Sequence, residues 1–195
     1  MKTCLVGCGG IAAVHGSVLT SGIDTEFVAA ADIKPEKAQS YAENFHTKPY
    51  PSLESMLDAE KPDVLHICTP HYLHVPMTIY ALERNINVFM EKPPAISFDQ
   101  LEELKKAAAK SDAQLGFCYQ NRYNASIRAA KDLIDSGKAG KVLGARAFVT
   151  WCRGAAYYTE SGWRGSLKTE GGGVLINQSV HTQDLLCFLL GDPTA

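Results

Sequence analysis

The chain has 195 residues, of which 46% are hydrophobic and 21% are charged. This composition is typical of a soluble globular protein of one large domain, or one domain and part of another, and it argues against wholesale disorder. The formal net charge of −2 and the lack of any lysine- or arginine-rich block argue against a nucleic-acid or acidic-membrane partner.

No apolar run is long enough to cross a membrane. The short apolar run after Met1 predicts a buried first strand rather than a signal peptide. The six cysteines are scattered and form no C-x-x-C pair, so neither disulfides nor a cysteine zinc site is expected. We therefore expect a cytoplasmic protein.

Short apolar runs alternate with amphipathic stretches over the first 120 residues. The runs predict parallel strands that are covered on both faces, at Thr3–Val6, Glu26–Ala31, Val64–Cys68, Asn87–Met90 and Gln114–Cys118. Helices are predicted between them, over an apolar stripe of Ile11, Val14, Val18 and Leu19, from Pro35 to about Phe45, from Ser52 through Leu57, over Val75–Arg84, and over Leu101–Ala109 behind a Ser97 capping box. This alternation predicts an α/β fold with a doubly wound parallel sheet.

The pattern changes near residue 120. Arg122–Ser136 predicts a helix, Lys141–Cys152 a strand, and Val174–Leu190 a long apolar helix that Gly191 stops. A loop rich in glycine and aromatic residues precedes this last helix. One strand cannot form a sheet alone, so residues 121–195 are expected to be the beginning of a second, incomplete domain after a first domain of residues 1–120.

A glycine-rich loop joins the first predicted strand to the first predicted helix, where Gly7, Gly9 and Ala12 match the pattern G-x-G-x-x-A. The first glycine permits a tight turn, the second lets the backbone approach a pyrophosphate, and the small third residue lets helix and strand pack closely. The helix N-terminus offers further N–H groups to phosphate, which adds Gly10 and Ile11 to the predicted cofactor contacts. A tight turn without a ligand is the alternative.

Asp32 ends the second predicted strand, 20 residues after Ala12. A carboxylate at this place meets the adenosine ribose hydroxyls and repels a 2′-phosphate, which favours NAD over NADP. Lys34 can reach a phosphate, so NADP stays open. A turn or helix-capping acid is the alternative for Asp32.

Lys92 follows another predicted strand, within Glu91-Lys92-Pro93. Ligands of such sheets bind at the carboxyl ends of strands, so Lys92 is expected at the same crevice as Gly9. A lysine there can hold a substrate hydroxyl or ease its proton transfer. A solvated surface lysine is the alternative.

Three histidines raise the question of a metal. His66, His71 and His74 lie close in sequence, but no carboxylate stands at ligand spacing and His66 falls within a strand. We expect no metal site.

The last predicted helix carries a polar stripe of Asn177, His181 and Asp184, at i, i+4 and i+7. A histidine between an amide and a carboxylate is an oriented acid/base. A water-facing stripe or a satisfied core histidine is the alternative. Three glycines just before the helix favour close packing or a mobile approach to a ligand.

Together these residues resemble the Gfo/Idh/MocA family of oxidoreductases, over nearly the whole chain. The resemblance rests on Gly7-x-Gly9-x-x-Ala12, Asp32, Thr69-Pro70-x-x-x-His74, Glu91-Lys92-Pro93, Tyr119-x-x-Arg122, Trp163-Arg164 and Gly171-Gly172-Gly173-x-x-x-Asn177-x-x-x-His181-x-x-Asp184. It implies an N-terminal Rossmann domain and a C-terminal α/β domain with an open, mostly antiparallel sheet, here truncated. It also implies a homo-oligomer when the protein is full length.

The resemblance implies hydride transfer between NAD(P) and a hydroxyl-bearing carbon of a sugar, inositol or related polyol. Lys92 is then expected to orient the substrate and assist proton transfer, and His181 to be the main acid/base, with Asn177 and Asp184 beside it. The expected cofactor contacts, besides the glycine loop and Asp32, are Thr69, Pro70, His74, Glu91 and Lys92. The expected substrate contacts, besides Lys92 and His181, are Tyr119, Arg122, Trp163 and Arg164.

Two departures from the family pattern leave other functions open. Members that use an Asp–His pair carry aspartate where this chain has Asn177, and family members are longer than this chain, which alone is then expected to be inactive. NAD-dependent glycoside hydrolysis without net redox is one alternative. A non-catalytic nucleotide-binding regulatory module is the other.

Overall fold

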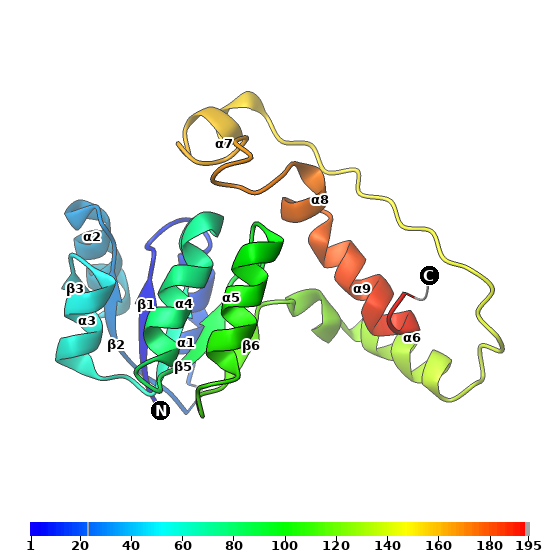
Figure 1. The fold of residues 1–195 in the computed structure, drawn as a ribbon, viewed down its shortest axis with the longest axis horizontal. Helices are drawn as coiled ribbons and strands as arrows, with labels where there is room; N and C mark the ends of the chain where they lie inside the picture. The colour runs from blue at the N-terminus through cyan, green and yellow to red at the C-terminus, as the bar shows by residue number, and fades with distance from the viewer. Residues whose placement is uncertain (23, 194–195) are drawn as a thin grey trace. The chain divides into compact units, whose positions relative to one another are not determined.

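The computed structural model describes residues 1–22 and 24–193. The chain separates into two compact units, Met1–Cys118 and Tyr119–Ala195, and each is described by itself (Figure 1). Among the described residues, no helix combines the length and the apolar character needed to cross a bilayer.

The first unit is built on one six-stranded sheet in which every strand pair is parallel. The strands are β1 (Lys2–Val6), β2 (Glu26–Ala31), β3 (Lys48–Tyr50), β4 (Val64–Ile67), β5 (Asn87–Met90) and β6 (Leu115–Phe117). Their order, β3-β2-β1-β4-β5-β6, is the usual one for a dinucleotide-binding fold and reverses direction between β1 and β4. The predicted doubly wound parallel sheet is confirmed.

Five helices connect these strands: α1 (Ala12–Leu19), α2 (Pro35–Phe45), α3 (Leu53–Glu60), α4 (His74–Leu82) and α5 (Phe98–Ala108). Local sequence fixes several of their starts. Pro35 occupies the first turn of α2, the Ser52 hydroxyl accepts from Ser55 N at 3.1 Å, and the Ser97 hydroxyl accepts from Gln100 N at 3.2 Å. A short 3₁₀ turn, His71–Leu73, leads into α4.

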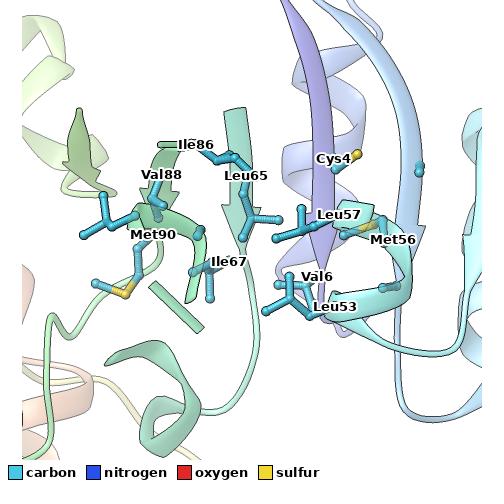
Figure 2. Packing of buried hydrophobic residues seen from close by; sticks show 14 of the residues in the cluster. Cys4, Val6, Leu53, Met56, Leu57, Leu65, Ile67, Ile86, Val88 and Met90 are labelled. Atoms are coloured by element: carbon cyan, nitrogen blue, oxygen red, sulfur yellow. The ribbon is translucent and has the colours of Figure 1, made fainter. Parts of the chain in front are cut away.

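Alternation along the strands divides the core between the two faces of the sheet. On one face, strand residues such as Leu65 and Met90 pack against α3, α4 and α5 (Figure 2). On the other face, Leu5 and Ala30 pack with Ala12 of α1 and Tyr41 of α2. Both faces are therefore covered, which explains why the strand sequences are apolar almost throughout.

The predicted apolar stripe of α1 is confirmed only at Leu19. Ile11, Val14 and Val18 are exposed, and Ala12, His15 and Gly16 are buried with Leu19. The reason is the close approach of α2, since a Cβ on Gly16 would lie 2.6 Å from Tyr41 Oη. The same hydroxyl donates to the Ala12 carbonyl at 2.7 Å. Small residues, Ala12 and Gly16, therefore make the part of the packing face that α2 approaches.

Among the described residues of the second unit, the regular secondary structure is helical and irregular segments connect it. It contains a 3₁₀ turn (Gln120–Tyr123) and the helices α6 (Ala125–Asp135), α7 (Ala155–Thr159), α8 (Val174–Asn177) and α9 (Val180–Leu190). The predicted strand Lys141–Cys152 is irregular, because it has no partner to complete a ladder. Correspondingly, the expected antiparallel sheet is not formed by the part of this unit that the structure describes.

The predicted helix Val174–Leu190 is interrupted at Gln178 and Ser179. There the Ser179 N–H donates at 2.8 Å to the Val174 carbonyl, five residues back instead of four. This wider turn ends α8 and offsets α9 from it. The single long helix is therefore corrected to two.

Candidate functional site

The glycine loop lies at the carboxyl end of β1. Gly7 has φ +92°, and a Cβ there would sit 2.8 Å from backbone atoms of Cys68 and Thr69, so this position requires glycine for both conformation and space. A Cβ on Gly9 or Gly10 would meet nothing within 4 Å. The loop thus packs closely against the residues that follow β4 at its first glycine, and it faces open space at the next two.

Asp32 organises that loop from the end of β2. One carboxylate oxygen accepts from Cys8 N at 2.9 Å, and the other accepts from Lys34 N at the same distance. Burial, together with the Asp32 charge, raises the pKa of the Cys8 thiol to about 12. Cys8 is therefore a protonated packing residue rather than a nucleophile.

The carboxyl end of β4 presents an unsatisfied hydroxyl. Thr69 Oγ1 is buried and has no hydrogen-bond partner among the described residues. Next to it, Pro70 begins the turn that leads into α4. A buried hydroxyl without a partner costs free energy, and a bound group that accepts or donates a hydrogen bond there removes that cost.

His74 ties two strand ends together from inside the fold. Its side chain is 0% exposed, with Nδ1 2.9 Å from the Pro93 carbonyl and Nε2 2.9 Å from the Thr69 carbonyl. Burial lowers its pKa, although both carbonyl contacts oppose that shift. The geometry gives His74 a supporting place under the loops rather than direct access to a cofactor.

Glu91 and Lys92 follow β5, next to β4 in the sheet. Lys92 N donates to Glu91 Oε2 at 3.3 Å, and the Lys92–Pro93 peptide is cis. Burial by itself raises the pKa of Glu91, but the hydrogen bond and charge of His15 reverse the shift, so the pKa is lowered. The carboxylate beside Lys92 is thus held ionised by a histidine on α1.

That histidine belongs to a buried chain of polar side chains that no spacing pattern in the sequence predicted. His15 Nε2 lies 3.1 Å from Glu91 Oε1, and His15 Nδ1 lies 2.9 Å from His66 Nδ1. Burial, with His15 nearby, lowers the pKa of His66 to about 4. His66 is therefore neutral at pH 7, and the Nδ1–Nδ1 hydrogen bond needs at least one neutral ring.

The structure also groups three atoms of metal-binding type, from His15, Glu91 and Cys118, within 4.8 Å of one another. These differ from the histidine group that the sequence raised. His15 and Cys118 both hydrogen-bond to the Glu91 carboxylate, so the cluster satisfies itself without an ion. The cluster is therefore a hydrogen-bonded group centred on the Glu91 carboxylate, with the Cys118 thiol as one donor.

The polar features of the first unit gather at one edge of the sheet, on both sides of the β1–β4 reversal, where such folds bind dinucleotides. The open space above Gly9 and Gly10 leaves room for a pyrophosphate. Asp32 lies directly after β2 at the same edge, and Thr69 Oγ1 lacks a partner among the described residues. These residues fit a dinucleotide.

The second unit holds the predicted acid/base His181 near the start of α9. The ring is buried and packs edge-on to Tyr119, with centroids 6.2 Å apart. Burial, followed by the charge of Asp184, raises the pKa of Tyr119 to about 12. Tyr119 is therefore a neutral hydroxyl beside a histidine.

Asn177 and Asp184 have partners that the helical spacing did not predict. Asn177 Nδ2 donates to Glu170 Oε1, and it lies 3.1 Å from Tyr157 Oη. Asp184 receives a bidentate ion pair from Arg122, with Nε to Oδ2 at 2.8 Å. The expectation that these two residues stand beside His181 stays a prediction, and each has an additional partner in its own unit.

Glu170 is a buried residue that the sequence reading passed over. It is 2% exposed, and its second oxygen accepts from Gly165 N at 2.7 Å. Its carboxylate therefore joins the loop between α7 and α8 to Asn177, the last residue of α8. The signal available in the sequence was a lone acid directly before three glycines.

Trp163 and Arg164, the remaining predicted substrate residues, lie in that same loop. The Arg164 guanidinium stacks on the Trp163 ring at 4.7 Å and on Tyr157 at 4.2 Å. Both residues are partly buried. The loop thus presents an arginine whose plane is fixed by aromatic rings.

Comparison with known proteins gives two family matches. Residues 1–119 match the model of an oxidoreductase family with an NAD-binding Rossmann fold, GFO/IDH/MocA. Residues 127–195 match the model of the GFO/IDH/MocA C-terminal domain. The two matches meet close to the boundary between the two structural units.

Individual relatives have related activities. D-glucoside 3-dehydrogenase of Escherichia coli is 29% identical over 99% of this chain and 55% of its own length. 1,5-Anhydro-D-fructose reductase of Ensifer adhaerens is 31% identical over 93% of this chain and 54% of its own length. The chain thus spans about half the length of these relatives.

A solved structure resembles the whole chain. The WlbA dehydrogenase from Chromobacterium violaceum, in complex with NADH and UDP-GlcNAcA, superposes with a TM-score of 0.93 at 33% identity. The match covers 98% of this chain and 55% of that one.

Proposed function

The chain belongs to the Gfo/Idh/MocA family of oxidoreductases, and we propose that it serves hydride transfer between NAD and a hydroxyl-bearing carbon of a sugar or polyol. The observation that carries the proposal is the open glycine loop beside Asp32 and the unsatisfied Thr69 hydroxyl, with Lys92 two strands along the same sheet edge.

Gly9, Gly10 and Ile11 would hold the pyrophosphate through backbone N–H groups, since no side chain stands over the two glycines. Asp32 would exchange its bond with Cys8 N for the ribose hydroxyls and repel a 2′-phosphate, so NAD is preferred over NADP. Bound NAD supplies the acceptor for the hydride.

Lys92 would bind the substrate hydroxyl. Oxidation removes a hydride from the carbon and a proton from its oxygen, and a nearby ammonium stabilises the charge that develops on that oxygen. The neighbouring Glu91 is ionised and tied to His15, which keeps the end of β5 in a fixed conformation. The backbone at Lys92 is therefore held in place before the substrate binds.

His181 would accept the proton as general base, and return it when the reaction runs in reverse. It is buried against the neutral Tyr119, which limits its exchange with solvent. The pH dependence of turnover would then follow this imidazole.

The relatives support the substrate class. Their names describe dehydrogenation or reduction at a sugar carbon, in D-glucoside 3-dehydrogenase, 1,5-anhydro-D-fructose reductase and glucose-6-phosphate 3-dehydrogenase. Sugars are therefore a better first screen for this chain than inositols.

The test measures NADH formation with methyl glucoside, glucose 6-phosphate and myo-inositol, for the natural sequence and for Lys92→Ala and His181→Ala. Each variant is expected to lose about a hundredfold or more in kcat, the usual contribution of one positioned acid/base group. Lys105→Ala, which removes an exposed lysine on α5 that pairs with Glu102, is the control and should change nothing. Full turnover in both site variants would rule out their assigned roles.

Two other outcomes identify the alternatives. Cleavage of a glycoside without accumulation of NADH identifies the redox-neutral hydrolysis. NAD binding by calorimetry, with no turnover of any sugar, identifies a binding module.

A further inference from the structure

Two arginines and three aromatic residues of the second unit form a series of cation–π contacts, the arginine–aromatic ladder: Trp151, Arg153, Tyr157, Arg164 and Trp163. The Arg153 guanidinium lies 5.4 Å from the Trp151 ring centre and 5.3 Å from that of Tyr157. The Arg164 guanidinium lies 4.2 Å from Tyr157 and 4.7 Å from Trp163. One tyrosine ring therefore has two guanidinium groups against it.

The charge of the ladder is not balanced within the part of the chain that the structure describes. Neither Arg153 nor Arg164 has an ion pair there, and the buried Arg164 Nε lacks any hydrogen-bond acceptor. Arg122 of the same unit, by contrast, has a bidentate bond to Asp184. Two like charges on one ring repel each other, and a partly buried guanidinium without an anion costs free energy.

The buried acid of the same segment, Glu170, already has other hydrogen-bond partners. Glu170 accepts from Gly165 N and from the Asn177 amide, and it is buried. Its hydrogen bonds fix the loop that carries Arg164. The buried carboxylate of the unit thus holds the loop in place, while the charges of the two ladder arginines have no ion-pair partner among the described residues.

Stacking determines what such arginines can bind. Aromatic rings engage the flat faces of a guanidinium and hold its plane, which leaves the N–H edges to bind in the plane. Those edges match a carboxylate or a phosphate, each of which accepts two parallel hydrogen bonds. A neutral sugar hydroxyl would leave the repulsion between the two arginines in place.

We propose that the arginine–aromatic ladder binds an anionic substituent, a carboxylate or a phosphate, on the sugar substrate, with Arg153 and Arg164 as its ligands. This inference rests on the proposed function, because it names which sugars the enzyme accepts. It adds Arg153 and Tyr157 to the substrate residues and favours charged sugars over neutral ones.

The chain carries a built-in probe for this site. Its two tryptophans, Trp151 and Trp163, are the two ends of the ladder. Tryptophan fluorescence therefore reports on the ladder without a label. The 195-residue chain is titrated with D-glucuronate and glucose 6-phosphate, and in parallel with methyl glucoside and inorganic phosphate.

The charged sugars should change the fluorescence with dissociation constants at least about tenfold lower than that of methyl glucoside, and their affinity should fall as salt is raised. Arg153→Gln and Arg164→Gln should each weaken binding about tenfold or more. Arg128→Gln, which removes an exposed arginine stacked on Tyr123, is the matched control and should leave binding unchanged.

Arg153 is exposed, so its replacement leaves the fold intact and keeps the test valid if Arg164→Gln unfolds. Equal affinity for neutral and charged sugars overturns the proposal. So does inorganic phosphate binding as tightly as glucose 6-phosphate, because the ladder would then be a bare anion site.

NAD binding, measured by calorimetry on the same samples, separates this proposal from the proposed function. Intact NAD binding and turnover, without preference for charged sugars, contradict only the proposed anion site of the ladder. Charged-sugar binding that depends on both arginines, in a chain that binds no NAD, sinks the dehydrogenase assignment and leaves the anion site standing.

Discussion

The two units of this chain differ in how much apolar surface they bury. The first unit hides an apolar core on both faces of a six-stranded sheet. In the second unit, the described residues that are buried are all polar: Glu170, Asn177, Gln178, Ser179 and His181. Several of its large apolar side chains, including Leu143, Phe148 and Leu175, are exposed.

This difference means that the first unit is held mainly by its apolar core, and the second by polar contacts that fix side-chain positions. The first unit has an apolar core that explains its fold by itself. The second unit cannot be explained that way, because hydrogen bonds around Glu170 and an ion pair at Arg122 link its segments. Buried polar groups give little net stability, but they fix geometry, which a substrate site requires.

The largest effect should come from the core of the first unit. Leu65→Ala in β4, which is fully buried, should lower the free energy of unfolding by about 3 kcal/mol, because it removes buried surface and leaves a cavity. Chemical denaturation followed by circular dichroism measures this.

The matched change in the second unit is Leu143→Ala. Leu143 is 92% exposed, so the loss should stay within about 0.5 kcal/mol. A loss as large as that of Leu65→Ala would contradict the contrast between the units.

Acid should weaken the first unit through His66. The folded protein keeps this ring neutral down to a pKa of about 4, whereas the unfolded chain protonates it near 6.5. The unfolded state therefore binds more protons as the pH falls from 6.5 to 4, and stability should drop by on the order of 2–3 kcal/mol.

His66→Asn should flatten this dependence while keeping an acceptor for His15. The other members of this hydrogen-bonded chain are His15 on α1 and Glu91 after β5. Because the pKa of Glu91 is lowered in the folded protein, Glu91 reduces the free energy of unfolding further only as the pH falls below about 4.5. An unchanged pH profile in His66→Asn would assign the acid sensitivity elsewhere.

A smaller effect is expected at the cofactor edge. Asp32→Asn removes the charge that repels a 2′-phosphate and should weaken NAD binding about tenfold, close to 1.4 kcal/mol, while NADP binding improves. Calorimetry with both dinucleotides measures the ratio. Asp112→Asn, on an exposed turn, is the control, and the same ratio in both variants would remove Asp32 from cofactor selection.

The smallest effect concerns the Arg122–Asp184 pair. The arginine is 40% exposed, so solvent screens the pair and its coupling should be about 1 kcal/mol or less. A double-mutant cycle with Arg122→Gln and Asp184→Asn measures it. A coupling near zero would mean that the pair fixes geometry without adding stability.

Motifs were read more accurately from the sequence than packing faces. The glycine loop, Asp32 and Lys92 were found because a strand followed by a fixed local pattern defines them. The apolar stripe of α1 was misread, because the approach of α2 at Gly16 decides which face is buried. The partners of Asn177 and Asp184 were missed, because helical spacing states which residues share a face and not what lies opposite.

By itself, the sequence determined the parallel sheet, the places of its loops and the family, since local periodicity and short motifs carry that information. The tertiary structure decided the rest: the His66–His15–Glu91 chain and the arginine–aromatic ladder. The members of the chain come from three elements that lie far apart in sequence, and the ladder depends on how one loop folds back on itself. Contacts of this kind depend on burial and on the order of strands in the sheet, which no local pattern encodes.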